Sequence, residues 1–334
     1  MKKVKNTKKL RIVGMAINIV VTAGAVLGLY FAGFSWFAFG AWVIAAGFCM
    51  LTHEIFYHRY FAHKCYKTGP KAQAVMAVLG AIAPVRGPLW FAANHRDHHK
   101  YTDTDRDPHS PLRGYWHAYM GWLYDERNIG TTYSNVADIN RYKSIKLIDR
   151  LFFLPMLLSF IAAYYIGSYL GAAYPHLETS GLQLLTWAGF LRVLYVYHVM
   201  ALLNSLSHAT IRDPKVRFGY RNFNSPDSSR NMWLVAILGV GVGWHNNHHT
   251  YGVYASTRVM WWEYDMSAAC IWIMEKCGII WDVRWPPKEF IERARAEREN
   301  ERQLDRDIMS NKVSHLPEKK KKVAPKEENL PKSA

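Results

Sequence analysis

The chain has 334 residues, of which half are hydrophobic and 14% are aromatic, and it carries a formal net charge of +16. Its 13 Trp and 20 Tyr residues are typical of a protein whose aromatic rings lie at a membrane–water interface. No nucleic-acid-binding module is visible. We therefore assign the positive charge to membrane topology and attraction for anionic lipid, and exclude nucleic acid as a partner.

The first apolar region runs from residue 12 to residue 52 without any Lys, Arg, Asp or Glu. About 20 apolar residues suffice for one helical crossing of a bilayer, so the region is long enough for two. The stretch "AGFSWF" near Gly33 is the expected turn, with spans near 12–32 and 36–56. A cleaved signal peptide is the alternative for the first span, but its apolar core should stop after about 7 to 15 residues.

A second pair of apolar segments follows the central polar part of the chain. "LFFLPMLLSFIAAYYIGSYLGAAY" begins at Leu151, and "LQLLTWAGFLRVLYVYHVMALL" begins at Leu182. We expect spans near 151–173 and 182–203. The chain is therefore predicted to be an all-α integral membrane protein with four transmembrane helices in two hairpins.

The distribution of Lys and Arg predicts the orientation of these hairpins. Residues 1–11 form a basic segment, whereas neither hairpin turn contains Lys or Arg. Because these residues concentrate in cytosolic loops, both termini, the segments 57–150 and 205–285, and any site within them are expected in the cytosol. Cysteines on that side stay reduced. We therefore expect no disulfide among Cys49, Cys65, Cys270 and Cys277.

The composition changes after the main domain, which we place at residues 12–285. Residues 286–334 begin with "WPPKEF", and residues 288 to about 308 are rich in Glu and Arg, which predicts a charged helix. The lysine-rich remainder has almost nothing to bury, so it is predicted to be a disordered basic tail.

Histidines gather in motifs at the expected cytosolic ends of the spans or in cytosolic segments. The motifs are "HRYFAH", "HRDHH", "NSLSH" and "HNNHH". The candidate metal-binding residues that they supply are His58, His63, His95, His98, His99, Asn204, His208, His245, His248 and His249.

The spacing of residues in a helix predicts which side chains of these motifs lie on the same face. Residues at positions i, i+3 and i+4 of an α-helix project from one face, so each HxxHH motif presents three imidazoles on one side. Asn204 and His208 also share a face. His58 and His63, five residues apart, do not, so we expect the helix to end or distort between them.

Imidazole suits iron, copper, nickel or zinc, whereas calcium and magnesium prefer oxygen ligands. Nine imidazoles and one carboxamide match two ions with about four to six ligands each. The absence of Cys from the motifs disfavours structural zinc and iron–sulfur sites. A single HxxHH motif is also compatible with a solvated helix face, but the four motifs together favour a metal centre.

The motifs resemble those of the integral-membrane acyl-CoA desaturases of the stearoyl-CoA, delta-9 type. "HRYFAH", "HRDHHKYTDTDRDPHSP" and "GWHNNHH" resemble the three histidine boxes of that family in the same order. "NSLSH" resembles the family's Asn-Ser-Xaa-Xaa-His element after the fourth span. The similarity covers roughly residues 15–285.

The resemblance implies a helical cytosolic cap that holds a non-haem diiron centre. It implies nine histidine ligands, with Asn204 acting through water; the nine are His58, His63, His95, His98, His99, His208, His245, His248 and His249. The implied reaction uses O2 and two electrons to form a cis double bond from two adjacent methylenes of a long saturated acyl chain, between carbons 9 and 10 of an acyl-CoA. Zinc is a possible substitute for iron in purified protein.

The chain departs from the family's pattern at two positions, and the resemblance also implies an electron donor. Many relatives have an acidic residue where this chain has Val242, and Trp90 lies five residues before His95 where many have Trp four before. No cytochrome b5 signature is visible in the chain, which implies a separate electron donor such as cytochrome b5 or a ferredoxin.

Several polar residues lie near the candidate ligands in the sequence, and we expect them to have supporting or structural roles. We expect one or two of the nearby aspartates to orient ligand imidazoles, with turn formation as the alternative; they are Asp97, Asp103, Asp105 and Asp107. His109 and His117 are assigned supporting or structural roles. His53 is expected to hydrogen-bond locally, and His176 and His315 to lie too far away.

Two polar residues lie within the fourth predicted span. Arg192 is expected to pack and to bond to carbonyls, Tyr195 or Tyr197. His198 is expected to lie too deep for the metal cluster.

Two alternative functions stay open. A membrane diiron alkane or fatty-acid hydroxylase has similar histidine boxes but inserts oxygen. A metal transporter is expected to place its ligands near the middle of the bilayer, on broken helices.

Overall fold

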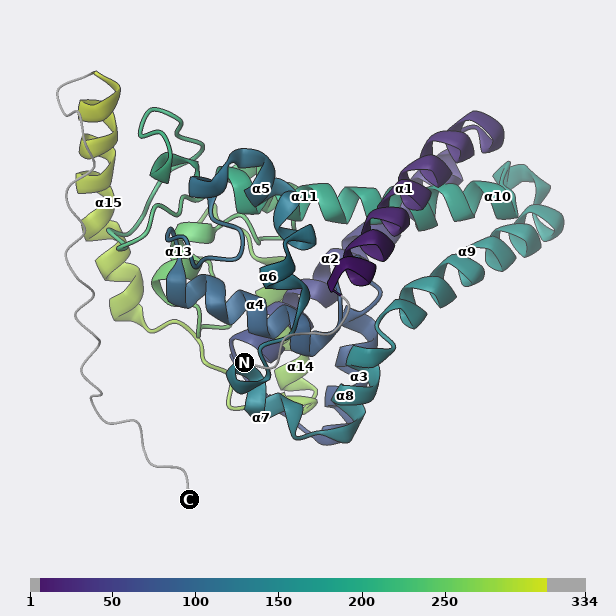
Figure 1. Cartoon of the computed structure of the whole chain (residues 1–334), viewed down its shortest axis with the longest axis horizontal. Coiled ribbons are helices and arrows are strands. Elements are labelled where there is room, and N and C mark those ends of the chain that lie inside the picture. The colour runs from purple at the N-terminus through teal and green to yellow at the C-terminus, as the bar shows by residue number, and fades with distance from the viewer. Residues whose placement is uncertain (1–6, 311–334) are drawn as a thin grey trace.

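The computed structural model describes residues 7–310, and most of these residues are helical (Figure 1). The predicted tail beyond residue 310, with His315, and residues 1–6 lie outside the described part. The apolar helical elements are α1 (Thr7–Ala32), α2 (Trp36–Thr52), the π-helical η1 (His53–Ala62), α9 (Phe153–Ala173), α10 (Gly181–Leu184), the π-helical η6 (Leu185–Leu191) and α11 (Arg192–Leu206).

The other elements form what we call the globular region, residues 63–150 and 207–309. Its α-helices are α3 (Pro70–Gly80), α4 (Pro88–Tyr101), α5 (Tyr115–Tyr119), α6 (Glu126–Ile129), α7 (Ala137–Asn140), α8 (Lys143–Arg150), α12 (Trp233–Leu238), α13 (His245–Thr250), α14 (Met266–Lys276) and α15 (Lys288–Met309). Short 3-10 turns are η2 (Pro111–Arg113), η3 (Gly121–Tyr124), η4 (Tyr133–Val136) and η7 (Ala209–Ile211), with η5 (Pro175–Leu177) between α9 and α10. The strands β1 (Lys67–Thr68) and β2 (Ile280–Trp281) pair antiparallel, with Lys67 opposite Trp281.

Within the described residues, four helical stretches are long and apolar enough to cross a membrane. They are Lys8–Ala32, Trp36–Ala62, Phe153–Ala173 and Pro175–Ile211. The four spans expected from the sequence overlap these stretches. The fourth stretch is longer than the expected 182–203 at both ends, because η5 precedes it and η7 extends it.

The spans pack against one another mainly through the fourth stretch. α9 packs along α10 and η6, and α1 and α2 also contact η6. Figure 1 shows the far ends of α1, α9 and α10 extending together away from the globular region. Arg192 is buried at the start of α11 and donates to the Ser159 hydroxyl of α9 over 2.9 Å. The expected packing of Arg192 is confirmed. The expected bonds to carbonyls, Tyr195 or Tyr197 are wrong, because its hydrogen bond goes to Ser159 of α9.

Glycine permits the close approach of α1 to η6. A Cβ atom added at Gly28 would lie 2.3 Å from the Thr186 hydroxyl, and one added at Gly24 would lie 2.7 Å from the Phe190 ring. Both distances are too short for real side chains, so the contact depends on these two glycines.

Buried ion pairs connect η1 to the globular region. Arg59 is 1% exposed, and its guanidinium donates to Glu54 over 3.1 Å and to Asp265 over 3.0 Å. It also donates to the Ala255 carbonyl. Because a buried charge is costly unless it is paired, these contacts hold η1 and the start of α14 in fixed relative positions.

The predicted charged helix is confirmed as α15, which packs on the globular region. Phe290 and Ala294 are buried, and Glu301 lies 3.2 Å from Arg221. Asp305 forms ion pairs with Arg217 and Arg230. All four cysteines are free, and Cys49 and Cys65 are buried among apolar side chains.

The glycine contact between α1 and η6 is testable. Gly28→Ala should destabilise the protein by about 1–3 kcal/mol, because the added methyl group overpacks the contact with Thr186. Gly40→Ala is the matched control, since nothing lies within 4 Å of its added Cβ. Thermal unfolding in detergent measures the difference, and equal melting temperatures for the two variants would contradict this packing.

Candidate metal centre

The π-helical segment η1 positions the first two candidate ligands. In this segment hydrogen bonds run from residue i to i+5, and the His63 N–H donates to the His58 carbonyl over 3.1 Å. The wider turn rotates residues five apart toward the same side, and the two imidazole centroids lie 4.8 Å apart. The expected distortion between His58 and His63 is therefore confirmed.

α4 supplies three candidate ligands and is held at its N-terminus by an acidic side chain. The Asp149 carboxylate accepts hydrogen bonds from the backbone N–H groups of Leu89 and Trp90 over 2.9 and 3.2 Å. A carboxylate at this position satisfies free N–H groups and interacts favourably with the helix dipole. Because the helix is fixed in this way, its histidines at residues 95, 98 and 99 have fixed directions.

α13 carries the other HxxHH motif and is only six residues long. The Asn231 side-chain oxygen accepts hydrogen bonds from the backbone N–H groups of Asn246 and Asn247 over 2.9 and 3.2 Å. The Asn222 amide donates to the Asn247 side chain over 3.0 Å. Buried asparagines thus hold a helix that is too short to be stable by itself.

The nine candidate histidines meet in two adjacent groups. The first group, which we call group 1, is His58, His63, His95, His99 and His248. The second, group 2, is His98, His208, His245 and His249. The candidate ligand atoms within each group all lie within 4.8 Å of one another.

Each HxxHH motif divides its side chains between the two groups. The i and i+4 histidines of α4 point into group 1, and its middle histidine, His98, points into group 2. α13 has the reverse arrangement, with His245 and His249 in group 2 and His248 in group 1. The two helices therefore connect the groups. We expected each motif to present three imidazoles on one side of its helix. The structure shows that these three imidazoles are shared between two groups.

All nine imidazoles turn Nε2 toward a neighbouring imidazole of the same group. In group 1 the Nε2 atoms of His63 and His95 lie 2.7 Å apart, and those of His58 and His248 lie 3.0 Å apart. In group 2 the Nε2 atoms of His208 and His245 are separated by 3.0 Å. Two nitrogens bound at right angles to one ion, each about 2.1 Å from it, lie about 3 Å apart. The donor set thus fits a metal ion in each group.

Carboxylates contact the outward-facing nitrogens of four of these imidazoles. His58 Nδ1 lies 2.8 Å from Glu54, and His98 Nδ1 lies 2.9 Å from Asp107. His208 Nδ1 lies 3.2 Å from Asp103. His249 Nδ1 lies 3.4 Å from Asp227. The contacts of His58 and His98 are hydrogen bonds, which fix the tautomer with Nε2 free to bind and orient the ring.

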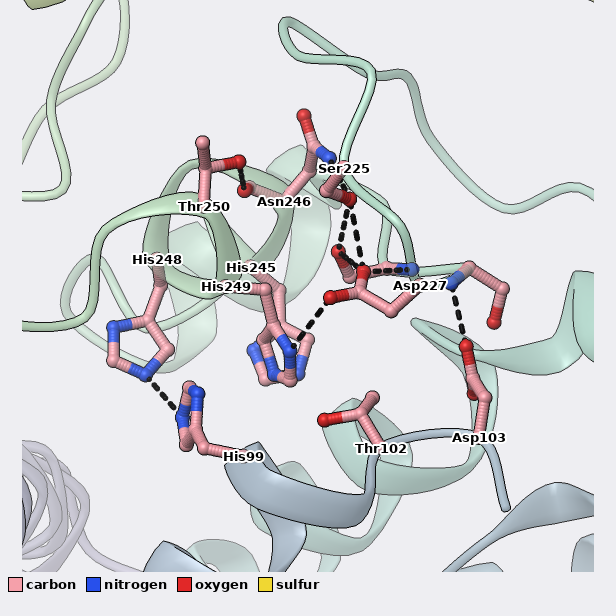
Figure 2. A network of polar contacts seen from close by, with 12 residues as sticks. His99, Thr102, Asp103, Ser225, Asp227, His245, Asn246, His248, His249 and Thr250 are labelled. Atoms are coloured by element: carbon pink, nitrogen blue, oxygen red, sulfur yellow. Dashed lines mark hydrogen bonds and ion pairs between the residues drawn. The ribbon is translucent and has the colours of Figure 1, made fainter. Parts of the chain in front are cut away.

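Figure 2 shows how one of these carboxylates is itself held. Asp227 faces His249 and accepts a hydrogen bond from the Ser229 N–H over 3.0 Å. The Ser225 hydroxyl donates to the same carboxylate over 2.9 Å. In the same view Asp103 accepts a hydrogen bond from the backbone of the loop that carries Asp227. The loop therefore positions two carboxylates of group 2.

Asp103 and Asp107 contact candidate ligand imidazoles, as expected, and both also accept hydrogen bonds from loop backbone N–H groups, as the turn alternative expects. Asp97 instead accepts a hydrogen bond from Asn135 over 3.1 Å, and Asp105 is exposed. Sequence reasoning missed Glu54 and Asp227 as imidazole partners. Glu54 lies four residues before His58, which is a readable helical spacing, whereas Asp227 lies in an irregular loop that carries no periodic signal.

Five other histidines of the described residues lie outside groups 1 and 2, and His53 is one of them. His109 packs against His98 with ring centroids 4.1 Å apart, and His117 contacts the Pro108 carbonyl over 3.0 Å, as expected for supporting roles. His198 accepts or donates a 2.7 Å hydrogen bond with Tyr119. His176 is exposed in η5.

The expected local hydrogen bond of His53 is wrong. Both of its ring nitrogens are buried without a hydrogen-bond partner among the described residues. The ring packs edge-on against Phe91, with centroids 4.7 Å apart, because the π-helical turn directs it into the apolar core.

A cavity of about 70 Å³ lies beside the two groups. His58, His95, His98, His245 and Asn204 all line it. Most of its remaining wall is apolar, including Trp90, Met200 and Val242. Val242 thus adds an apolar side chain to the cavity wall.

Burial keeps most of these imidazoles neutral. It holds the pKa values of His95, His98, His245, His248 and His249 well below the usual range, and neighbouring imidazoles add to the effect. Burial alone would raise the pKa of Asp103, but His208 and the Ser228 N–H lower it to about 2. Neutral imidazoles and an ionised carboxylate are the protonation states that metal binding needs.

The sequence model of the family described as "Fatty acid desaturase" matches residues 34–272. A hex-5-enoyl-[acyl-carrier protein] acetylenase from Moorena producens is 34% identical over 76% of this chain and 77% of its own length. An acyl-CoA 5-desaturase from Anemone leveillei is 30% identical over 76% of this chain and 74% of its own. An sn-1 stearoyl-lipid 9-desaturase from Anabaena variabilis is 29% identical over 82% of this chain and 95% of its own length.

The carboxylate that orients His98 gives a testable prediction. Asp107→Asn removes the charge that holds the His98 tautomer, so metal affinity should fall about 10- to 100-fold. Asp105→Asn, in the same loop but exposed, is the control. Metal retained after dialysis against a chelator is the measurement. Equal retention by the two variants would be incompatible with an orienting role for Asp107.

The depressed imidazole pKa values predict how stability depends on pH. Below about pH 6.5 the unfolded chain binds protons at these histidines, whereas the folded chain does not. The free energy of unfolding of the metal-free protein should therefore fall as the pH is lowered from 7.5 to 5.5. Thermal unfolding at both values tests this. His248→Gln should reduce the dependence, and His176→Gln, at an exposed position, should not. A stability that is constant over this range would refute the prediction.

Proposed function

The chain belongs to the fatty acid desaturase family, and from this premise we propose that it desaturates a long saturated acyl chain with O2. The proposed substrate is an acyl-CoA, and the product carries a cis double bond between carbons 9 and 10. Removal of two hydrogens is balanced by reduction of O2 to two waters, with two electrons and two protons from outside the chain. A single observation carries this proposal, namely nine buried or half-buried imidazoles in two convergent groups beside a largely apolar cavity.

We propose that each group holds one iron ion. The ligands in group 1 are His58, His63, His95, His99 and His248, and those in group 2 are His98, His208, His245 and His249. Asn204 is proposed to contribute through a water molecule, which its position in the cavity wall supports. Iron bound there would supply the O2 chemistry that removes hydrogen from an unactivated methylene, and zinc is a possible occupant in purified protein.

The residues around the cavity have two tasks in this proposal. Apolar walls such as Met200, Leu203 and Trp122 exclude water from the reaction and confine the acyl chain. The same confinement places one pair of methylenes beside the imidazole groups, and positioning of this kind is a large part of catalysis. No side chain of the cavity has to act as an acid or a base on the substrate.

The proposed topology places the metal centre in a cytosolic cap above two transmembrane hairpins. Support comes from the basic residues 1–11 and from turns without Lys or Arg. Both termini and the globular region lie on the cytosolic side in this arrangement. A separate donor, such as cytochrome b5 or a ferredoxin, then delivers electrons to the cap.

A polar cavity supports the choice of a phosphate-bearing carrier. This cavity of about 610 Å³ shares Asn94 with the cavity beside the histidine groups. Its wall includes Lys100 and Arg106, which both contact Tyr101, together with the carboxylates of Asp97 and Asp105. The two cations suit the phosphates of coenzyme A, whereas the carboxylates oppose them. The relatives named above act on three different carriers, so the carrier needs its own test.

Fatty-acid profiling tests the proposed function. A desaturase-deficient host that expresses the unmodified chain should form a new monounsaturated acid, with its double bond located by mass spectrometry. His248→Ala removes a group 1 ligand and should abolish the product, while the exposed His176→Ala should not. A hydroxylated acid as the product would contradict desaturation and favour the hydroxylase alternative. Supplying saturated chains on coenzyme A, acyl carrier protein or lipid to membranes then identifies the carrier.

A further inference from the structure

A membrane-facing groove lies between α1 and α11. Its volume is about 610 Å³, and its wall includes Ile19, Ala23 and Val26 of α1 and Leu194 of α11. Ile19 and Val26 are 67% and 62% exposed, in a helix that is apolar enough to span a membrane. An apolar groove in this position suits a hydrocarbon chain.

A smaller cavity of about 50 Å³ lies between this groove and the histidine groups. It shares His53, Val85, Trp122, Leu123, Met200 and Asn204 with the cavity beside the histidines. It shares Tyr197 with the membrane-facing groove. Three hollows that share wall residues therefore follow one another from the histidine groups to the lipid-facing side of α1.

Hydrogen bonds between polar side chains separate the small cavity from the groove. Tyr119 and His198 Nδ1 are joined over 2.7 Å, and Asn18 donates to the Tyr197 hydroxyl over 3.0 Å. Asn18 also donates to Tyr124. We call these five residues the polar gate: Asn18, Tyr119, Tyr124, Tyr197 and His198.

The polar gate is unusual for its surroundings. Asn18 and His198 belong to helices that are apolar enough to span a membrane, where polar side chains are costly and mark functional positions. All five residues are half-buried, and the gate joins α1, α11 and the segment that carries α5 and η3. Side-chain hydrogen bonds can break and form again while the helices keep their places.

We propose that the polar gate closes the far end of the acyl cavity and that the methyl end of longer substrates passes it into the groove between α1 and α11. This inference rests on the proposed function. The order of the hollows gives the direction in which the acyl chain lies. The cavity with Lys100 is at the opposite end of the series from the groove between α1 and α11. The polar carrier then lies at one end and the hydrocarbon end at the other, so the gate and groove set the longest chain accepted.

Filling the groove is the first test. Ala23 lines the groove, whereas Val20 lies on the same helix, is 62% exposed and does not line it. A host that expresses each variant is supplied with saturated acids of graded length. Ala23→Trp should lower the desaturated share of the longest acids at least about tenfold, the effect of excluding two methylenes from an apolar site. Shorter acids, and all acids with Val20→Trp, should be unaffected.

Opening the gate is the second test. Tyr119→Phe and His198→Leu each remove the hydrogen bond between these two residues. Each should raise the desaturated share of the longest acids by about fivefold, the equivalent of one net hydrogen bond. Tyr169→Phe, at an exposed position on α9, should leave the profile unchanged.

The outcomes separate this inference from the proposed function. If the unmodified chain forms unsaturated acids but the groove and gate variants keep its length profile, the inference is wrong and the function stands. If the unmodified chain forms none, both are contradicted. Thermal stabilisation of the purified chain by saturated acyl-CoA esters gives a readout without turnover. Ala23→Trp should lose only the additional stabilisation that the longest esters provide.

Discussion

Nine imidazole nitrogens approach one another inside the protein, and the rest of the structure serves to hold them there. A neutral imidazole offers either one N–H or one lone pair at Nε2. His248 Nε2 lies 3.0 Å from His58 Nε2 and 2.9 Å from His99 Nε2, so it cannot form full hydrogen bonds to both. A cation bound in each group, as proposed above, would remove this conflict. The free energy of metal binding would then contribute to the free energy of folding of the elements that carry the histidines.

Three local devices make the convergence possible. The π-helical turn of η1 brings together two histidines that an ordinary α-helix would separate. Asp149 fixes the start of α4, and Asn231 fixes the start of α13. Hydrogen bonds to Glu54 and Asp107 then set the tautomers of His58 and His98. The buried Arg59 ion pairs connect this assembly to α14, so the ligand helices and the spans form one packed unit.

The spans and the histidine motifs were predictable from the sequence because their signals are local. An apolar run such as residues 12–52 predicts spans directly, and the repeated HxxHH spacing predicts ligand-bearing helices. The split of each motif between two groups was not predictable, because it depends on how α4 and α13 cross. Asp227 and the unpaired nitrogens of His53 escaped prediction for a related reason, since their surroundings come from segments distant in sequence.

Family membership accounts for the histidine motifs, whereas the polar gate is inferred from the hydrogen bonds of this structure. The central claim is that groups 1 and 2 each bind one ion. An anomalous difference map recorded at the iron absorption edge, from protein expressed with iron, tests it directly. Two peaks, one enclosed by each group, are the predicted result. One peak shared by both groups, or peaks outside them, would contradict the account.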